Sequence, residues 1–334
     1  MNHTIEVPHR RFNPLTGQWV LVSTGRTQRP WTGQTDAVVA SDRPEYDPDC
    51  YLCPGNTRAG GVDNPQYDST FVFTNDFASL NPLTPDVAVS DHPLLQAHSE
   101  HGTCRVICFS PRHDLTLANM PAAAVRATVE LWASQVEELS ASYEWVQVFE
   151  NRGELMGASN PHPHGQIWAG SALPTLPGLE DSHQLAYTTD TGRLLLSDYL
   201  DEELTDGSRI VVDGEAWVVL VPYWAVWPYE TMVLPKESIG HLDDTTNAQR
   251  DDLAAVLQKL LGRYDALFSR SFPYSMGWHG RHADHWTLHG HFFPPLMGPD
   301  RQKFMVGYEM LAEAQRDISA EDAADRLRSV GERT

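Results

Sequence analysis

The chain has 334 residues, of which 41% are hydrophobic, enough to form the core of one large domain or two smaller ones. Its formal net charge of −21 argues against nucleic acid or an anionic membrane as the main partner, because both require a basic protein surface. The 4 cysteines are too few for the disulfide framework of a secreted protein, and the N-terminal residues form no apolar signal segment. We therefore expect a cytoplasmic protein without a membrane-spanning segment.

A first set of elements is predicted in the N-terminal half. A strand over residues 105–110 precedes a helix that begins at Pro121, where the missing N–H of proline costs no hydrogen bond. One face of this helix carries the apolar residues Val125, Val129, Trp132, Val136 and Leu139. A strand over 145–150 and a loop rich in Gly, Asn and Pro then lead to a histidine-rich strand over 162–168.

The same elements are predicted in the same order in the C-terminal half. A strand over residues 231–234 is followed by a helix, a short strand near Tyr274 and a histidine-rich segment over 285–293. The apolar face of the helix consists of Leu253, Leu257, Leu260, Tyr264 and Leu267. Both halves end in His-x-His, which favours an internal duplication over a chance repetition of common elements.

The halves are expected to span residues 1–175 and 176–334. The stretch 170–195, rich in Pro, Ser and Thr, is predicted to link them. A strand over 303–310 and a helix from about Ser319, capped by Ser319 and Asp322, are predicted at the C-terminal end.

The segment NPHPHGQIW carries the clearest chemical signal. Alternate residues of a strand face the same side, so His162, His164 and Gln166 are expected in one row. Pro163 stiffens the backbone between the histidines, and Gly165 leaves room for a ligand or another backbone segment. Neutral imidazole is a competent nucleophile near pH 7 and can divide one difficult transfer into two easier ones. A histidine pair that only binds metal or donates hydrogen bonds in the core is the alternative.

Two groups of residues have the composition of metal sites. Cys50 and Cys53 have zinc-site spacing, although a Cys-x-x-Cys pair alone is also compatible with redox chemistry or with no function. In the second half, His289 and His291 share one strand face, which suits two ligands of one metal. His279 is a candidate third ligand, and His282 is its rival. Histidines that only satisfy hydrogen bonds in the core are the alternative.

The segment MGASNPHPHGQIWA, at residues 156–169, resembles the active-site motif of the galactose-1-phosphate uridylyltransferases, a branch of the histidine-triad superfamily. The resemblance implies that His164 is the nucleophile that attacks the α-phosphorus of UDP-glucose. Gln166 matches a neutral residue that hydrogen-bonds the phosphoryl oxygens, at a position where most histidine-triad hydrolases have a third histidine. Ala158 departs from the family, whose members often have cysteine there.

The resemblance extends from about residue 8 to residue 332 and implies the fold and the metals. It implies an α+β protein in which a histidine-triad-like fold is duplicated, with one antiparallel half-barrel sheet covered by helices. It implies a structural zinc ion bound by Cys50, Cys53, His113 and His162. It also implies a second metal, iron or zinc, bound by Glu180, His279, His289 and His291. Finally, it implies a homodimer whose subunits share their active sites.

The same resemblance implies a set of substrate contacts. Arg26 and Arg29 match residues that reach the phosphates from the partner subunit. The uridine and ribose contacts match Tyr51, Leu52, Asn75 and Asp76, and the phosphate-loop contacts match Asn151 and Ser159. The hexose phosphate and hexose contacts match Lys303, Phe304, Val306, Tyr308, Glu309 and Gln315. Each residue alone could be a solvated surface or turn residue, but together they follow the family order along the chain.

The expected reaction converts UDP-glucose and galactose 1-phosphate into glucose 1-phosphate and UDP-galactose, by ping-pong kinetics through a uridylyl group on His164. Two alternatives remain. A dinucleoside polyphosphate phosphorylase would transfer an adenine nucleotide to inorganic phosphate. A metal-stabilised nucleotide-binding protein would show no turnover.

Overall fold

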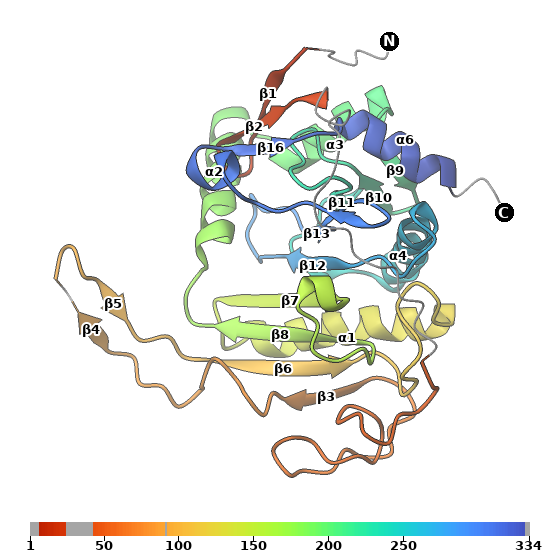
Figure 1. Ribbon diagram of the computed structural model, residues 1–334. Coiled ribbons are helices and arrows are strands. Elements are labelled where there is room, and N and C mark those ends of the chain that lie inside the picture. Colours follow the sequence, from red (N-terminus) through yellow and green to blue (C-terminus); the bar gives the residue numbers. More distant parts are fainter. Residues whose placement is uncertain (1–6, 25–42, 91, 331–334) are drawn as a thin grey trace.

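The computed structural model describes residues 7–24, 43–90 and 92–330, and within them a large antiparallel sheet dominates the fold (Figure 1). Nine strands form this sheet in the described part of the chain, and every neighbouring pair is antiparallel. In spatial order they are β3 (Phe71–Thr74), β6 (Gly102–Cys108), β8 (His164–Gly170), β7 (Trp145–Arg152), β12 (Tyr274–His279), β13 (His289–Phe293), β11 (Thr231–Pro235), β10 (Trp217–Leu220) and β9 (Ile210–Asp213).

The strand order shows how the two halves are related. In chain order, the first half runs β6, α1 (Ala122–Ser140), β7, β8, and the second half runs β11, α4 (Asn247–Leu267), β12, β13. In the sheet, these strands lie in the order β6-β8-β7 and then β12-β13-β11, so the halves meet where β7 pairs with β12. The predicted α+β architecture with duplicated halves in one antiparallel sheet is therefore confirmed.

Helices α1 and α4 cover one face of the sheet and form the main core with it. The apolar face predicted for α1 is buried throughout, as are Leu253, Leu257, Leu260 and Tyr264 of α4, whereas Leu267 is partly buried. Pro121 occupies the N-cap position of α1 instead of lying in its first turn. Thr246 occupies the N-cap position of α4, where its side chain accepts a hydrogen bond from the Gln249 N–H. The apolar stripe visible in the sequence thus determines which side of each helix is buried.

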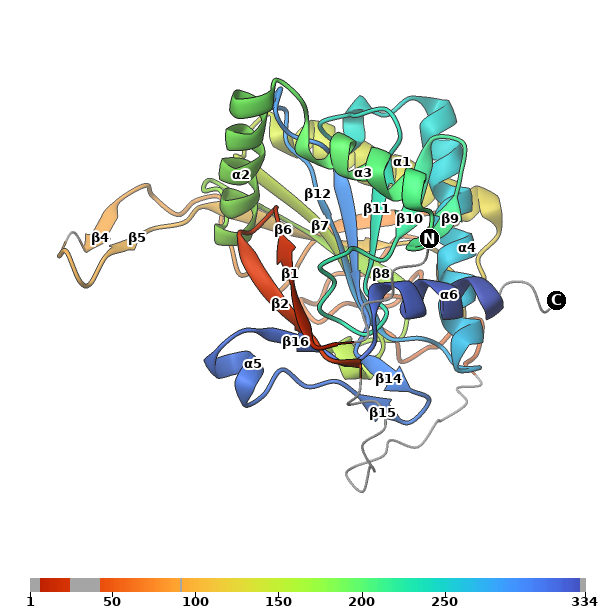
Figure 2. The same cartoon turned by 90° about the horizontal axis from the view of Figure 1, so that it is seen from above.

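On the opposite face, helix α2 (Thr175–Thr191) lies over β12 and β13, where its Glu180 meets His279 and His289, and a second core covers β10 and β11. There α3 (Leu195–Asp206) and the three-stranded sheet of β1 (His9–Asn13), β2 (Gln18–Val22) and β16 (Ala314–Arg316) form this second core. In Figure 2, β1, β2 and β16 lie beside one another, with α2 close by. The part of this face formed by β7 and β8 is left for the site.

Smaller elements complete the described chain. They are β4 (Ala88–Ser90), β5 (Ala97–His98), β14 (Leu296–Gly298), β15 (Arg301–Gln302), α5 (Tyr308–Leu311), α6 (Ala320–Val330) and the 3-10 turns Glu154–Met156 and Leu242–Asp244. The β4–β5 hairpin extends away from the rest of the molecule in both views (Figures 1 and 2). Ser319 accepts a hydrogen bond from the Asp322 N–H ahead of α6, as expected for the predicted cap.

Two predicted elements are wrong. The stretch predicted as a linker contains helix α2, in which Pro177 and Gly178 lie near the N-terminal end and are tolerated there. The strand predicted over residues 303–310 does not form, because Gly307 has φ +60°, a left-handed conformation that interrupts an extended chain. One short helix, α5, follows it.

Candidate functional site

His164 is the first residue of β8, on the sheet face that α1 does not cover. Its Nδ1 lies 2.7 Å from the carbonyl oxygen of His162, and a carbonyl only accepts, so Nδ1 carries the ring proton. The remaining nitrogen, Nε2, then has the free lone pair. Burial lowers the pKa of His164, which keeps the ring neutral at neutral pH.

The polar residues predicted beside His164 lie around it. Gln166 follows two positions later on β8, and its Oε1 accepts a hydrogen bond of 3.1 Å from the Trp168 indole. Asn151 on β7 accepts a hydrogen bond of 2.6 Å from the Ser275 hydroxyl. Asn151, Ser159, His164 and Gln166 line one small cavity. The structure thus places two amides, a hydroxyl and an imidazole around one small space.

His162 does not belong to this row, which corrects the prediction. Pairing with β6 ends where His164 faces Cys108, so His162 precedes the strand. Its N–H donates to the Asn160 side chain at 2.9 Å, and its ring is 1% exposed. At Gly165, a Cβ would come within 2.8 Å of the Phe149 carbonyl oxygen and of the Phe109 ring, so a backbone segment and a ring occupy the expected room there.

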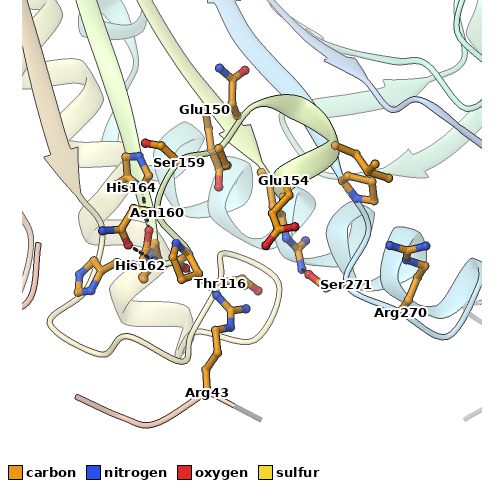
Figure 3. A pocket seen from close by; sticks show the side chains of 18 residues that line it. Arg43, Thr116, Glu150, Glu154, Ser159, Asn160, His162, His164, Arg270 and Ser271 are labelled. Carbon is orange, nitrogen blue, oxygen red and sulfur yellow. Dashed lines mark hydrogen bonds between the residues drawn. The ribbon is translucent and has the colours of Figure 1, made fainter. Parts of the chain in front are cut away.

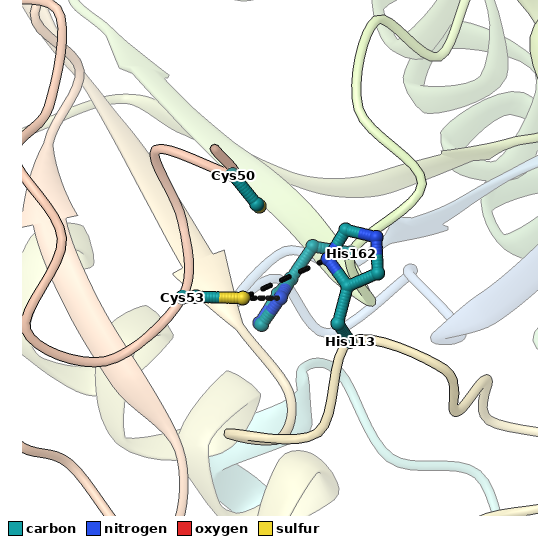
Figure 4. A group of neighbouring side chains, drawn as sticks. All are labelled: Cys50, Cys53, His113 and His162. Atoms are coloured by element: carbon teal, nitrogen blue, oxygen red, sulfur yellow. Dashed lines mark hydrogen bonds between the residues drawn. The ribbon is translucent and has the colours of Figure 1, made fainter. Parts of the chain in front are cut away.

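His162 instead lies with Cys50, Cys53 and His113, and the four side chains converge (Figure 4). The Cys53 sulfur lies 3.7 Å from His113 Nδ1 and 3.6 Å from His162 Nδ1. Tetrahedral zinc with ordinary Zn–S and Zn–N bonds places sulfur and nitrogen ligands about 3.6 Å apart. The residues therefore fit a tetrahedral metal ion.

The protonation of this group also suits a metal. His162 Nε2 donates to the Ser110 carbonyl at 2.8 Å, which leaves Nδ1 as the lone-pair nitrogen. Burial lowers the pKa of His162 to about 3 and raises the pKa of the Cys53 thiol to about 11. Neutral imidazoles are ready ligands, and a buried thiolate requires a cation beside it.

A second group in the other half consists of Glu180, His279, His289 and His291. Glu180 Oε2 lies 2.8 Å from His279 Nδ1 and 3.4 Å from His289 Nε2, and Glu180 Oε1 lies 4.0 Å from His291 Nε2. His289 Nε2 and both ring nitrogens of His291 are buried without a hydrogen-bond partner. Orphaned imidazole nitrogens that converge on a carboxylate fit a metal ion.

Charges within this group have clear effects on Glu180. Burial alone would raise its pKa, but His279 and His289 hold the pKa of Glu180 well below its usual range. His282 lies elsewhere, 3.1 Å from Asp243, so the geometry favours His279 over its rival.

A larger cavity of about 730 Å³ extends from His164 past the loop before β8 (Figure 3). Sequence reasoning missed the charged residues in its wall, which are Arg43, Glu150, Arg152, Glu154 and Arg270. The predicted strand stopped at residue 150, so Arg152 fell into a loop, although β7 continues through it. The sequence does not indicate that Arg43 and Arg270 line the cavity, because they come from segments far from the motif.

The remaining predicted substrate residues lie apart from these cavities. Leu52 is buried and Tyr51 is exposed, next to the cysteine pair. Asn75 and Asp76 follow β3, two strands away from β8, and Asp76 forms an ion pair with Arg58 at 3.3 Å. Arg26 and Arg29 lie outside the described residues.

The predicted hexose contacts form their own cluster near β16. Lys303 is buried and contacts both the Glu309 carboxylate and the Gln315 carbonyl oxygen. Phe304, Val306 and Tyr308 are exposed. Neither cavity lined by His164 includes a described residue from this segment.

In the described part of the chain, no helix combines the length and apolar character needed to cross a membrane.

Comparison with known proteins is consistent with this architecture. Residues 1–174 match the family model of the galactose-1-phosphate uridyl transferase N-terminal domain, and residues 180–333 match that of the C-terminal domain.

Similar proteins cover nearly the whole chain. A galactose-1-phosphate uridylyltransferase of Haemophilus influenzae is 51% identical over 98% of this chain and 95% of its own length. One of Rattus norvegicus is 50% identical over 98% of this chain and 89% of its own length. A solved uridylyltransferase structure has a TM-score of 0.77 at 22% identity, covering 96% of this chain and 98% of the solved chain. An ADP-glucose phosphorylase from Arabidopsis thaliana, solved with bound ADP-glucose, has a TM-score of 0.75 at 19% identity, with the same coverage of the two chains. The chain therefore belongs to the galactose-1-phosphate uridylyltransferase family and is a uridylyltransferase.

Proposed function

We propose that the protein transfers UMP from UDP-glucose to galactose 1-phosphate through a covalent uridylyl group on His164. The observation that carries this proposal is the hydrogen bond from His164 Nδ1 to the His162 carbonyl, which leaves Nε2 unprotonated. Nε2 attacks the α-phosphorus, the P–N bond forms, and the bond to the bridging oxygen breaks. Glucose 1-phosphate leaves with that oxygen and its electron pair.

The second half-reaction reverses the first with a new acceptor. A phosphate oxygen of galactose 1-phosphate attacks the same phosphorus, the P–N bond breaks, and UDP-galactose leaves. Asn151, Ser159 and Gln166 line the same small cavity as His164 and are positioned to donate hydrogen bonds to the phosphoryl oxygens. A neutral glutamine provides such a donor without acting as a base that would activate water, which favours transfer over hydrolysis.

The metals in this proposal are structural. Cys50, Cys53, His113 and His162 would hold a zinc ion, which would fix the backbone ahead of β8, because the carbonyl that orients His164 belongs to His162. Iron or zinc is the proposed occupant of the group formed by Glu180, His279, His289 and His291. The metal there would tie α2 to β12 and β13.

The proposed enzyme is a cytoplasmic homodimer with shared active sites. Supporting this, Phe304, Val306 and Tyr308 are exposed apolar residues outside both cavities lined by His164. In the proposed dimer, a second subunit would cover these exposed residues. Lys303, Glu309 and Gln315 of one subunit would then contact the hexose phosphate in the active site that the two subunits share. Arg26 and Arg29 are proposed to reach the partner's phosphates, and Tyr51, Leu52, Asn75 and Asp76 are proposed to hold the uridine. The two halves, residues 1–175 and 176–334, would then have separate roles, nucleophile and hexose contacts.

The test uses UDP-glucose labelled in the uracil ring, without acceptor. We expect about one label per chain, stable to base and labile to acid, on His164. Galactose 1-phosphate should release it as UDP-galactose, and His164→Gly should not become labelled.

Other outcomes identify other functions. Label from an adenine dinucleotide but not from UDP-glucose, released by inorganic phosphate, would indicate a phosphorylase. No label from either donor, with the protein folded and metal-loaded, would contradict covalent transfer and leave a binding protein.

A further inference from the structure

The large cavity beside His164 gathers positive charge in a strongly acidic chain. Arg43, Arg152 and Arg270 line it, whereas the whole chain has only 24 Lys and Arg against 45 Asp and Glu. The three arginines come from separate segments: the stretch before Cys50, the end of β7, and the loop before β12. Figure 3 shows Arg43 and Arg270 approaching from two sides. The fold therefore concentrates cations here against the overall charge.

Arg152 has unused donors in the wall of this cavity. The residue is 7% exposed, and its Nη2 donates to Asp265 at 2.9 Å and to the Ser271 hydroxyl at 3.0 Å. Its Nε and Nη1 are buried without any hydrogen-bond partner. Leaving buried donors of a charged group unpaired is unfavourable, because the group loses its hydrogen bonds to water and gains none in the protein. An acceptor in the cavity would remove that cost.

The other two arginines are also available to an anion. Arg43 donates to the Pro161 carbonyl at 2.6 Å and Arg270 to the Pro299 carbonyl at 2.8 Å, both neutral acceptors. Burial and the positive charge of Arg152 lower the pKa of Arg43. The two guanidiniums therefore repel each other, and an anion between them would turn that repulsion into attraction.

The two carboxylates in the wall oppose anion binding to different degrees. Glu150 is fully buried, and this burial raises its pKa to about 7, so near neutral pH much of it is protonated. Glu154 is an exposed carboxylate residue, and Figure 3 shows it between His164 and Arg270. A suitable ligand must therefore have a high charge and several acceptor oxygens, which are properties of a phosphate dianion.

We propose that the cavity of Arg43, Arg152 and Arg270 is a binding site for a phosphate dianion, either free or as part of a phosphomonoester. Nε and Nη1 of Arg152 bind its oxygens from the inside, and Arg43 and Arg270 close on it from the two sides. The volume of about 730 Å³ also admits a sugar attached to the phosphate. This binding is separate from the transfer chemistry, because it requires no bond to His164.

The experiment measures binding to the full-length protein at constant ionic strength. Inorganic phosphate is titrated calorimetrically, with chloride as the reference anion, and galactose 1-phosphate is titrated separately without any nucleotide. His164→Gly is titrated in parallel, and binding should persist in it. Failure of the transfer reaction therefore leaves this result unaffected.

Variants that remove a charge should change the phosphate affinity in opposite directions, depending on the sign of the charge removed. Arg152→Gln should weaken phosphate binding by about tenfold or more, and Arg270→Gln should weaken it by about threefold or more, because each removes a charged donor. Glu154→Gln should strengthen binding, because it removes an opposing charge. Arg126→Gln is the matched control, since Arg126 already pairs with Glu130 and Asp251 at 2.6 Å on the helix surface.

The outcomes are distinct. Galactose 1-phosphate that binds more tightly than phosphate, and loses affinity in Arg270→Gln, identifies a phosphomonoester site, whereas equal affinities identify free phosphate. If Arg152→Gln fails to fold, Arg270→Gln and Glu154→Gln decide, because both side chains lie nearer the solvent. No saturable phosphate binding, or affinities unchanged in both of these variants, would overturn the proposal.

Discussion

At the scale of single residues, a backbone carbonyl determines which nitrogen of His164 can react. The His162 carbonyl fixes the Nδ1 proton, and the same residue's ring lies in the cysteine–histidine group. Asn160 connects the two further, since its side chain accepts from the His162 N–H at 2.9 Å and donates to the Cys50 sulfur at 3.4 Å. The cysteine–histidine group and His164 therefore share one short stretch of backbone.

The pH dependence of the first half-reaction follows from the burial of His164. Burial lowers its pKa below the ordinary 6.5, so the reactive neutral ring persists as the pH falls through that value. We expect the rate of His164 uridylylation in single-turnover experiments to fall at acid pH with a midpoint below pH 6.5. An acid limb centred at or above pH 6.5 would contradict this assignment. Circular dichroism at each pH provides the control for folding.

At the scale of elements, helices with a regular apolar pattern can be predicted from the sequence, whereas a helix whose position depends on contacts with distant residues cannot. The stripes of α1 and α4 were visible because each helix buries one side at a fixed period. Helix α2 was missed because it buries only Pro177, Glu180 and Gln184, a set with little apolar character. Its position depends on contacts from Glu180 to histidines about one hundred residues later, which no local pattern reveals.

The cavity wall was missed for a similar reason. Asn151 and Ser159 were predicted from the family resemblance, which matches both to the phosphate-loop contacts ahead of His164. Arg43 and Arg270 reach the cavity only through the tertiary fold, and the unpaired nitrogens of Arg152 are known only from the coordinates. Motif reasoning therefore identifies His164 as a candidate residue and does not reveal the charged residues in the cavity wall.

Helix α2 provides a test of the second metal group. Glu180→Gln should remove the metal proposed for this group and leave the one proposed for the cysteine–histidine group, because a neutral amide is a poor replacement for a carboxylate ligand. We expect the metal content per chain to fall by about one ion, and His164 should still become labelled, because the nucleophile lies in the other half. The measurement is elemental analysis combined with the labelling assay.

A neighbouring residue of α2 provides the matched control. Asp181 pairs with His285 at 2.8 Å and with Arg281 at 3.2 Å, outside the metal group. Asp181→Asn should therefore keep both metals. Equal metal loss in the two variants would indicate that α2 acts through general stability, and unchanged metal content in Glu180→Gln would remove Glu180 from the ligand set.

At the scale of the whole molecule, the two halves share one sheet and one core. Strands β7 and β12 join them by hydrogen bonds, and α1 packs against α4 in a single hydrophobic cluster. Trp132 of α1 and Trp278 of β12 come from different halves, with ring centroids 6.2 Å apart, and each is 1% exposed. We therefore expect the halves to unfold together, although the chain divides neatly into two repeats.

Replacing these tryptophans tests that cooperativity. Trp132→Ala and Trp278→Ala should each lower the free energy of unfolding by about 3–5 kcal/mol through the cavity left behind. Their effects in the double variant should differ from additivity by about 0.5–1.5 kcal/mol, because the rings contact each other across the halves. Trp19→Ala is the control, since that ring is 43% exposed and its loss should cost less than about 1 kcal/mol.

The measurement is urea unfolding followed by far-UV circular dichroism and by fluorescence. Coincident transitions in all variants would show one cooperative unit, in which damage at the junction destabilises both halves equally. Two separated transitions, with only one shifted by Trp278→Ala, would show that each repeat folds alone. In that case the shared sheet would be a docking surface between two domains, and the rigid placement of His164 would have to come from the N-terminal half and its cysteine–histidine group by themselves.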